Sequence, residues 1–389
     1  LFFWCARMMM LGLEMVGDVP FRHVFIHGIV RNSDRSKMSK TKGNTVDPLE
    51  ITPKYGTDAV RLALVQASAP GADVIWTEDK LPASRAFANK IWNAARFLFL
   101  NMERAGVRPQ IPADPGPAET LEDRWIRSRL NAAAEAVNRA VDQQRYHEVG
   151  QTVWQFFWSE FCDWYVELKK LRFREGSGLD ANWRNLLWVF DQALRLLHPT
   201  MPFITEELWQ RLRGDDASLP KSITIAAYPS SDPARHYAAA EREMEILQEV
   251  ITSARNLRAE MKVDPKLALT GTLYAMNGDI DLEAVAKLAN VTLERKREKP
   301  EKLAGAVRST PDFDLILAVP LAQKDAQIKR LKKDNEQLEK TIANTERQLK
   351  DEKFTSKAPP AVIESMRAKL ADYQTQLRKN YEALDELSA

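Results

Sequence analysis

A continuous apolar run at residues 24–30 leads directly into a basic loop. The cations of this loop are Arg35, Lys37, Lys40 and Lys42. The run is rich in β-branched and aromatic residues and has Gly28 near its carboxyl end, which predicts a buried strand of a parallel sheet. Open α/β sheets bind ligands beyond the carboxyl ends of their strands. A basic loop at that place predicts a phosphate-binding site, and the alternative is a solvated turn between a strand and a helix.

The order of residues in this loop is more informative than its charge. Lys37-Met38-Ser39-Lys40, followed by Thr41, resembles the Lys-Met-Ser-Lys-Ser signature of class I aminoacyl-tRNA synthetases, with threonine in place of the final serine. Residues 21–48 and the opening residues 2–8 resemble valyl-tRNA synthetases in particular. In that family the loop closes over ATP while the amino-acid carboxylate attacks the α-phosphate. The resemblance implies a ligase whose substrates and partners are valine, ATP with Mg²⁺, and tRNA(Val).

The resemblance also assigns residues to the nucleotide site. Lys37 and Lys40 are the expected catalytic residues, because their ammonium groups would meet the charge that builds on the phosphates. The expected ATP contacts are Lys37, Met38, Ser39 and Lys40 in the loop, with Gly28 and Ile29 near the adenine. For the neighbouring His27, a hydrogen-bonded histidine of the core is the alternative.

Composition predicts an ordinary protein of several domains. The chain has 389 residues and a net charge of only +2, so any nucleic-acid surface has to be local. Cys5 and Cys162 are too few for a disulfide framework, and no Cys/His cluster has zinc spacing. No apolar run reaches the roughly 18 residues of a membrane span. We therefore expect no metal site and no membrane partner, and the resemblance implies a cytoplasmic monomer.

Helical periodicity dominates residues 81–213, within the expected domain 76–230. The expected helices are residues 85–103, 121–144, 150–173 and 183–197, with a short last helix from Thr205. These helices predict a bundle, and residues 156–169 and 196–209 resemble the anticodon-binding domain of the valine, isoleucine and leucine enzymes. Upstream of the bundle, residues 2–15 predict a short buried helix. Asp47-Pro48 predicts the start of another helix and Gly56 its end.

The first helix of this bundle carries a candidate RNA-binding face. When its apolar residues are turned inward, Lys90, Asn93 and Phe97 lie on another face, with Arg96 beside them. An aromatic ring among cations and amides can stack an unpaired base and hold its phosphates. The alternative is that Phe97 packs against a neighbouring helix. The resemblance makes this helix part of an anticodon-reading surface and favours contact with tRNA.

Residues 231–320 predict a small α/β module. The expected elements are a helix at 238–261, strands at 267–276, 291–293 and 313–319, and a short helix at 282–288; residues 223–228 before them are expected to be extended. Arg295-Lys296-Arg297 and Lys299 are either contacts to an RNA backbone or part of a solvated loop.

Two helices with heptad periodicity occupy most of residues 321–389. Apolar residues alternate three and four apart in both, and Pro359-Pro360 separates them, which predicts an antiparallel coiled-coil hairpin with Asn335 and Asn380 on its facing seams. Such a hairpin is a hallmark of valyl-tRNA synthetases, where it lies against the tRNA elbow. The resemblance makes Lys329, Arg330, Lys332 and Lys333 the expected phosphate contacts. The alternative is that these charges only solubilise the arm.

The sequence therefore predicts a multidomain, mainly α chain. Its expected parts are the end of a Rossmann-like α/β nucleotide-binding domain (1–75), a helical-bundle anticodon-binding domain (76–230), the α/β module (231–320) and the coiled-coil arm (321–389). The other class I signature, His-x-Gly-His, does not occur, and the chain begins at Leu1 without methionine. We therefore expect the carboxyl-terminal part of a synthetase, which does not form aminoacyl-adenylate by itself.

Other functions stay open. One alternative is part of an isoleucyl-type synthetase. The terminal hairpin and the lack of cysteines after Cys162 favour valine, because many bacterial isoleucine enzymes resemble one another in a Cys-rich zinc-binding end. A second alternative is a non-catalytic tRNA-binding module with a vestigial nucleotide loop. A third is a scaffold without an RNA partner.

Overall fold

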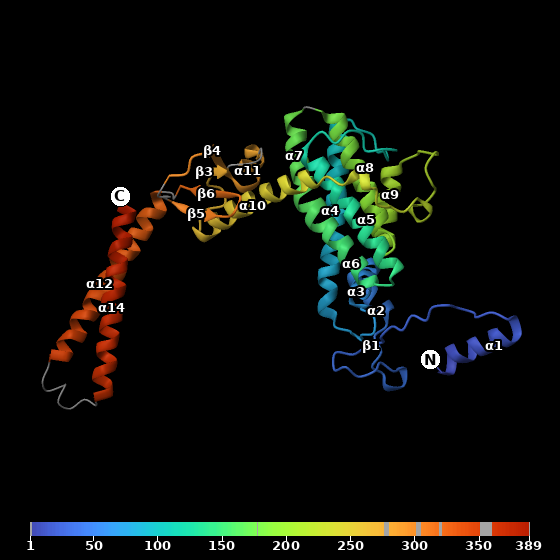
Figure 1. Ribbon diagram of the computed structural model, residues 1–389, viewed down its shortest axis with the longest axis horizontal. Helices are drawn as coiled ribbons and strands as arrows, with labels where there is room; N and C mark the ends of the chain where they lie inside the picture. The colour runs from blue at the N-terminus through green and yellow to red at the C-terminus, as the bar shows by residue number, and fades with distance from the viewer. Residues whose placement is uncertain are drawn as a thin grey trace. The chain divides into compact units, whose positions relative to one another are not determined.

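The computed structural model describes residues 2–176, 178–275, 280–300, 305–318, 321–350 and 360–388. The chain divides into two compact units, Leu1–Ile246 and Leu247–Ala389. Each unit has its own set of buried apolar side chains. Helices make up most of the described residues in both units (Figure 1).

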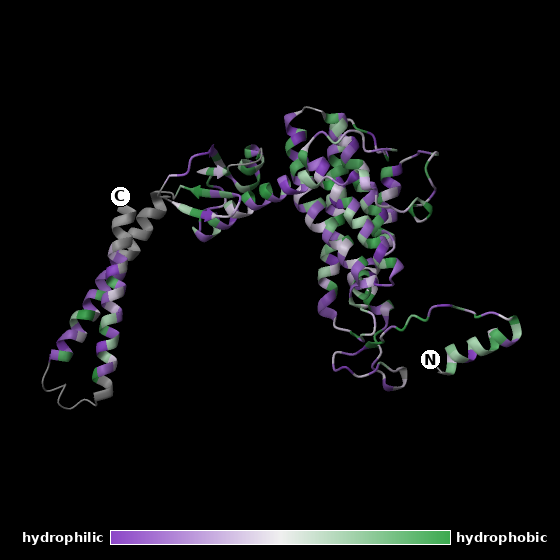
Figure 2. Ribbon diagram, in the orientation of Figure 1, coloured by the Kyte–Doolittle hydropathy of each residue, from purple (hydrophilic) through white to green (hydrophobic). Residues whose placement is uncertain are grey.

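The amino-terminal segment is helical but exposed. A π-helical turn (Phe2–Ala6) leads into α1 (Arg7–Val16), so the predicted helix at residues 2–15 is confirmed. The prediction that this helix is buried is wrong: none of the residues of α1 is buried, and Met15 is 79% exposed. Figure 2 shows α1 as a largely hydrophobic helix. The apolar composition of α1 indicates that another segment should cover it, but composition does not show which segment does so.

The first sheet has two short parallel strands. β1 (Val30–Arg31) pairs with β2 (Val74–Ile75), and α2 (Pro48–Tyr55) and α3 (Thr57–Ala67) form the connection between them. The predicted buried strand at 24–30 is wrong in extent and in burial, because only Val30 of that run is in a strand and Ile26 is 60% exposed. A strand in a parallel sheet is buried only when neighbouring strands pair with it and helices cover both faces of the sheet. A single partner strand of two residues does not bury this run.

The predicted start and end of α2 are confirmed. The Asp47 carboxylate accepts the backbone N–H of Leu49 at 2.8 Å, and Pro48 occupies the first helical position. Gly56 ends the helix with a φ of 91°, a conformation that glycine adopts readily. Local capping chemistry therefore decides both ends of α2.

A helical bundle forms the larger part of the first unit. Its helices are α4 (Leu81–Ala105), α5 (Leu121–Asp142), α6 (Tyr146–Gln155), α7 (Val166–Glu175), α8 (Leu179–Leu197) and α9 (Pro202–Arg213). A π-helical stretch, η4 (Phe156–Tyr165), joins α6 to α7, so the predicted helix at 150–173 is one continuous rod with an irregular middle. The centre of the bundle is aromatic. Its fully buried rings include Phe87, Phe157, Phe161, Phe190 and Trp209.

A network of polar side chains is buried inside this bundle. Lys169 is 0% exposed, and its ammonium group lies 2.7 Å from the carboxylate of Asp123, which is 2% exposed. The hydroxyl of Tyr165 donates to the same carboxylate at 2.7 Å, and Lys169 also donates to the side chain of Asn182. Burial and the neighbouring carboxylate of Asp123 raise the pKa of Tyr165 well above its ordinary value. A buried charge is tolerated when it is paired and hydrogen-bonded, as the Lys169 ammonium group is by Asp123 and Asn182.

Asp58 connects α3 to the bundle. Its carboxylate accepts the backbone N–H groups of Phe203 and Ile204, in the first turn of α9, at 3.2 and 2.7 Å. Arg61, one turn further along α3, donates to the carbonyl of Pro199. Burial raises the pKa of Asp58 from its ordinary 3.8, although the two N–H groups oppose the shift. A carboxylate at a helix amino terminus is electrostatically favourable, so this contact fixes α9 against α3.

We expect Asp58→Ala to lower the free energy of unfolding by about 1–3 kcal/mol, because it removes the acceptor of two N–H groups. We expect Asp58→Asn to cost less, because the amide oxygen can still accept. The folded pKa of Asp58 is raised, so its contribution to stability is present below about pH 4 and is lost as the pH rises through the folded pKa. Urea unfolding should therefore show that the free energy of unfolding of wild type, relative to that of Asp58→Asn, is lower at pH 7 than at pH 4. A difference that does not change with pH would contradict this assignment.

The second unit contains a four-stranded mixed sheet. Its strands are β3 (Leu269–Ala275), β4 (Val291–Lys296), β5 (Ala306–Ser309) and β6 (Phe313–Leu317), in the order β4-β3-β6-β5. β3 and β4 are parallel and are connected by α11 (Leu282–Ala289), and the other pairs are antiparallel. The longer α10 (Ala238–Glu260) precedes the sheet.

Most of the predicted elements of this module are confirmed, with two exceptions. β5 was not predicted, because its four residues are too short for an alternating pattern to stand out. Residues 223–228 do not form an extended segment throughout; they begin with a 3₁₀ turn, Ile223–Ile225, which the Ser222 hydroxyl caps by accepting from Thr224.

Two long helices end the described chain. α12 (Leu321–Lys350) and α14 (Pro360–Ser388) lie side by side and are antiparallel, because Asn380 donates to Asn335 at 2.9 Å and Gln374 donates to Glu346 at 3.2 Å. The pairing of Asn335 with Asn380 agrees with their predicted places on facing seams. Asn335 is only 4% exposed. An asparagine buried in an apolar seam, as Asn335 is, costs stability but fixes the register.

Candidate nucleotide and nucleic-acid sites

The basic loop starts immediately after β1 and is held by backbone bonds at its entry and by the Asn44 side chain at its exit. At its entry, Lys37 forms an antiparallel bridge with Arg31, and the backbone N–H of Arg35 donates to the carbonyl of Asn32 at 2.8 Å. At its exit, the side chain of Asn44 accepts the N–H of Ser39 at 2.8 Å and donates to the carbonyl of Lys37. The loop therefore has internal hydrogen bonds, although Lys37 and Lys42 on it are exposed to solvent.

Two aspartates support this loop. Asp73, just before β2, accepts the N–H of Ile29 at 2.9 Å and pairs with the guanidinium of Arg31. These contacts hold the pKa of Asp73 below its usual range, and bonds from Ser36 do the same for Asp34. Both carboxylates therefore stay ionised at neutral pH. Because Arg31 is paired with Asp73, the cations available for a phosphate lie further along the loop.

The expected nucleotide contacts differ in their surroundings. Lys37 is exposed, while Met38 lines an apolar cavity under the loop. The hydroxyl of Ser39 lies 2.7 Å from that of Thr41, and Thr41 is the residue that departs from the signature. The side chain of Lys40 lies outside what the structure describes, although its backbone is part of a 3₁₀ turn, Lys40–Lys42.

Gly28 lies where two backbone segments approach closely. A Cβ atom on Gly28 would be 1.9 Å from the carbonyl oxygen of Ala72, so only glycine fits at this position. Ile29 extends the pairing, because its carbonyl accepts the N–H of Val74 at 2.9 Å. His27 is exposed, and its Nδ1 contacts the carbonyl of Gly28, so it is not a histidine of the core. The structure gives Gly28 a packing role that does not depend on adenine.

We expect Gly28→Ala to break the pairing of the β1 and β2 segments. The new methyl group overlaps the Ala72 backbone, which cannot move away as a flexible side chain would. Amide hydrogen exchange at Val74 and Trp76, whose N–H groups donate to Ile29 and Arg31, should become about tenfold faster or more. Ile26→Ala, at a side chain that is 60% exposed, is the matched control and should leave exchange unchanged. Unchanged protection in Gly28→Ala would contradict the role given to this glycine.

A second candidate site lies on α4. Lys90 is partly engaged: it forms an ion pair with Asp163, and its Nζ lies 4.1 Å from the ring centroid of Trp158. Trp158 is itself stacked on Trp154, with ring centroids 5.3 Å apart. This cluster combines aromatic rings with a cation, the combination from which nucleic-acid-binding proteins build stacking surfaces.

Phe97 belongs to the same face of α4. It is half-buried, and the Nζ of Lys170 on α7 lies 4.7 Å from its ring centroid. Asn93 and Arg96 are exposed beside it, and in the described part of the chain Arg96 has no hydrogen bond or ion pair. The structure therefore brings the four predicted residues of α4 to one surface. Lys170 packs on Phe97, so the ring has a neighbour without being enclosed.

Three residues of this surface were not predicted from the sequence. Trp158, Asp163 and Lys170 come from η4 and α7 and meet α4 only in the folded bundle. The spacing of Trp154 and Trp158, four residues apart, places them on one face of a helix. It did not show that this face turns towards Lys90. Pairing between helices is a tertiary fact that one periodicity cannot predict.

The predicted phosphate contacts of the arm are only partly described. Lys332 and Lys333 are exposed on α12. The side chains of Lys329 and Arg330 lie outside the residues whose side chains the structure describes.

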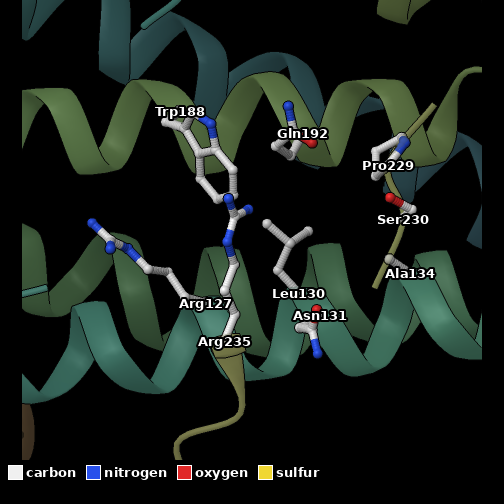
Figure 3. A pocket seen from close by; sticks show the side chains of 9 residues that line it. All are labelled: Arg127, Leu130, Asn131, Ala134, Trp188, Gln192, Pro229, Ser230 and Arg235. Carbon is white, nitrogen blue, oxygen red and sulfur yellow. The ribbon is translucent and has the colours of Figure 1, made fainter. Parts of the chain in front are cut away.

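One cavity in the bundle is too small for a substrate. Figure 3 shows a cavity between α5, α8 and the segment from Pro229 to Arg235, where Arg235 lies over the Trp188 ring at 5.0 Å. Its volume is about 20 Å³, enough for a water molecule and no more. Cys162 is also unsuited to chemistry, because burial raises the pKa of its thiol to about 12.

The described residues contain neither a metal site nor a membrane-spanning helix. Among the described residues, no three His, Cys, Asp or Glu side chains are grouped as metal ligands. Within the same residues, no helix combines the length and the apolar character needed to cross a membrane.

Comparison with known families gives three matches along the chain. Residues 1–77 match a model of class I tRNA synthetases for I, L, M and V, and residues 123–273 match the anticodon-binding domain of tRNA ligases. Residues 325–388 match the tRNA-binding arm of valyl-tRNA synthetases. The valine--tRNA ligase of Solibacter usitatus is 54% identical over 384 residues, which is 97% of this chain. The chain is a homologue of the valine--tRNA ligases.

Other valine--tRNA ligases support this relationship. Those of Geobacter sulfurreducens and Dehalococcoides mccartyi strain CBDB1 are each 40% identical over 96% of this chain. The chain spans 43% of the length of each of these three ligases. A solved ternary complex of the Agrobacterium radiobacter K84 agnB2 LeuRS with tRNA and LeuAMS aligns at 22% identity and a TM-score of 0.47, over 60% of this chain and 28% of that one. The resemblance to valyl-tRNA synthetases inferred from the sequence is confirmed.

Proposed function

We propose that this chain is the carboxyl-terminal part of a cytoplasmic valine--tRNA ligase, which activates valine with ATP and transfers it to tRNA(Val). Identity of 54% with a valine--tRNA ligase over nearly the whole chain is the observation that carries the proposal. Within that protein, the chain contributes the basic loop that closes over ATP, an anticodon-binding bundle and an arm for the tRNA elbow. The substrates are valine, ATP with Mg²⁺, and tRNA(Val), and the protein acts as a monomer.

The formed basic loop supports the nucleotide part of the proposal. Its ends are fastened by the Arg31–Lys37 bridge and by Asn44, while the Lys37 side chain is exposed. A lysine on a short, anchored loop can meet phosphate charge that develops in the transition state. We propose Lys37 and Lys40 as the catalytic cations, Met38 and Ser39 as further loop residues of the ATP site, and Gly28 and Ile29 as the adjoining backbone.

The α4 surface supports the RNA part of the proposal. We propose that an unpaired anticodon base stacks beside Phe97, with Lys90, Asn93 and Arg96 around it. Lys90 and Lys170 already lie over aromatic rings, so this surface joins positive charge to planar faces. The two antiparallel helices form the proposed coiled-coil arm, with Lys329, Arg330, Lys332 and Lys333 on phosphates.

Valine-dependent ATP–pyrophosphate exchange by the intact protein that contains this chain tests the activity. We expect exchange with valine and much weaker exchange with isoleucine. Preference for isoleucine would favour the isoleucyl-type alternative, and the absence of exchange with both would favour the non-catalytic module. The chain by itself should show no exchange, as the sequence predicts.

Binding of tRNA by the chain tests the RNA part separately. A surface that neutralises six to ten phosphates loses about 10³–10⁵ in affinity between 50 and 200 mM salt. In the double variant Lys332→Ala, Lys333→Ala, we expect weaker binding and a salt slope smaller by about 2, because each phosphate contact contributes about 1. Filter binding measures both quantities. An unchanged slope would show that these two lysines only solubilise the arm.

A further inference from the structure

Met38 is the one large apolar side chain in the basic loop. From Arg31 to Thr45 every other residue is polar, charged or glycine. Met38 is half-buried, while the lysine before it, Lys37, is exposed. The loop therefore has a single apolar attachment point next to its cations.

The cavity that Met38 lines is built from rigid parts of the fold. Val30 comes from β1, Ile51 from α2 and Val60 from α3, with Trp76 just after β2. Ile51 and Val60 are 4% and 5% exposed and belong to the core that connects these helices. Met38 therefore lines a cavity whose other walls come mainly from strands and helices of the fold.

The cavity beside Met38 has unfilled volume. Its volume is about 160 Å³, and the Nε1 of Trp76, on its wall, is buried without a hydrogen-bond partner among the described residues. Methionine is unbranched and flexible, so it can sit at different depths in such a space and keep its apolar contacts. A β-branched residue at this position would be stiffer, and a polar residue would not gain from the apolar contacts.

We propose that Met38 is a positioning residue, which anchors the basic loop in this cavity and thereby sets the place of the backbone that carries Lys37 and Lys40. The proposal rests on the proposed function only where it concerns catalysis. This positioning role differs from the expected contact between Met38 and ATP, because the Met38 side chain lines a cavity of the fold.

Limited proteolysis tests the anchor in the chain itself, without nucleotide. Trypsin cleaves after lysine, so the loop reports its own opening at Lys37, Lys40 and Lys42. We expect Met38→Ala to be cleaved there about tenfold faster than wild type, because the buried apolar contact is lost, and Met38→Leu to stay within about twofold. Met15→Ala, at a methionine that is 79% exposed, is the matched control and should behave as wild type.

Cleavage after Arg139, on the exposed face of α5, separates local opening from unfolding of the whole unit. It should stay at the wild-type rate in every variant. The anchor would be overturned if the loop of Met38→Ala were cleaved at the wild-type rate. It would also be overturned if Met38→Ala were cleaved after Arg139 as fast as in the loop.

Steady-state exchange in the intact protein tests the consequence for catalysis. If Met38 positions the lysines, Met38→Ala lowers kcat about tenfold and leaves the KM for ATP near wild type, and Met38→Leu restores kcat. A raised KM with unchanged kcat would mean direct contact with ATP and would overturn the positioning role. If Lys37→Ala left exchange normal, the proposed function of the loop would fail, while proteolysis of the Met38 variants would still decide the anchor.

Discussion

Lys169→Met is expected to lower the free energy of unfolding of the first unit by about 3–5 kcal/mol, because it leaves the Asp123 carboxylate buried without its cation. Lys169 is 0% exposed and Asp123 is 2% exposed, so water cannot replace the lost partner. The Tyr165 hydroxyl would still donate to Asp123, but one neutral hydrogen bond does not offset a buried charge. Urea unfolding followed by tryptophan fluorescence measures this, because all 10 tryptophans lie within residues 1–246.

The neighbouring lysine is a matched control. Lys170 follows Lys169 on α7, but its ion pair with Glu167 is accessible to solvent. The side chain of Lys170 is 31% exposed and that of Glu167 is 38% exposed. Such a pair contributes about 0–1 kcal/mol, so Lys170→Met should change stability little. The double variant Lys169→Met, Asp123→Leu should be more stable than Lys169→Met alone, since it removes both charges. Equal losses in Lys169→Met and Lys170→Met would show that burial does not set the strength of this pair.

The helices were predictable because each is determined by nearby residues. Asp47, Pro48 and Gly56 fix both ends of α2 by capping and backbone conformation, and the apolar repeat of α4 places Phe87 and Met102 in the core. The buried strand at 24–30 was wrong for the opposite reason. An apolar run predicts the need for cover, but the cover comes from other segments, and Ile26 has too little of it to be buried.

The candidate sites were predictable where one segment contains them. The order of residues from Lys37 to Thr41 identified the loop, and helical spacing placed Lys90 and Phe97 on one face. What the sequence did not predict is contact between segments. The cavity that Met38 lines has other walls from two strand regions and two helices, and no periodicity within the loop points to it.

Lys37→Ala is expected to lower kcat for valine-dependent exchange by about 10²–10³ in the intact protein that contains this chain. This is the usual loss when a preorganised group that stabilises transition-state charge is removed. The bridge to Arg31 and the bond from Asn44 hold the Lys37 backbone in place, so its ammonium group is delivered with little reorganisation. The KM for ATP should change much less, because an interaction made mainly in the transition state affects kcat.

Lys42 provides the control for charge alone, because it is exposed in the same loop and the signature does not include it. We expect Lys42→Ala to stay within about threefold of wild type in kcat, since a general field from an exposed cation is screened within about 10 Å in 0.1 M salt. The comparison is made at 50 and 200 mM salt. A pure charge effect would shrink at high salt and would be equal for the two lysines, whereas a positioned cation keeps its effect. If Lys42→Ala lost as much activity as Lys37→Ala, the specific role of Lys37 would be refuted.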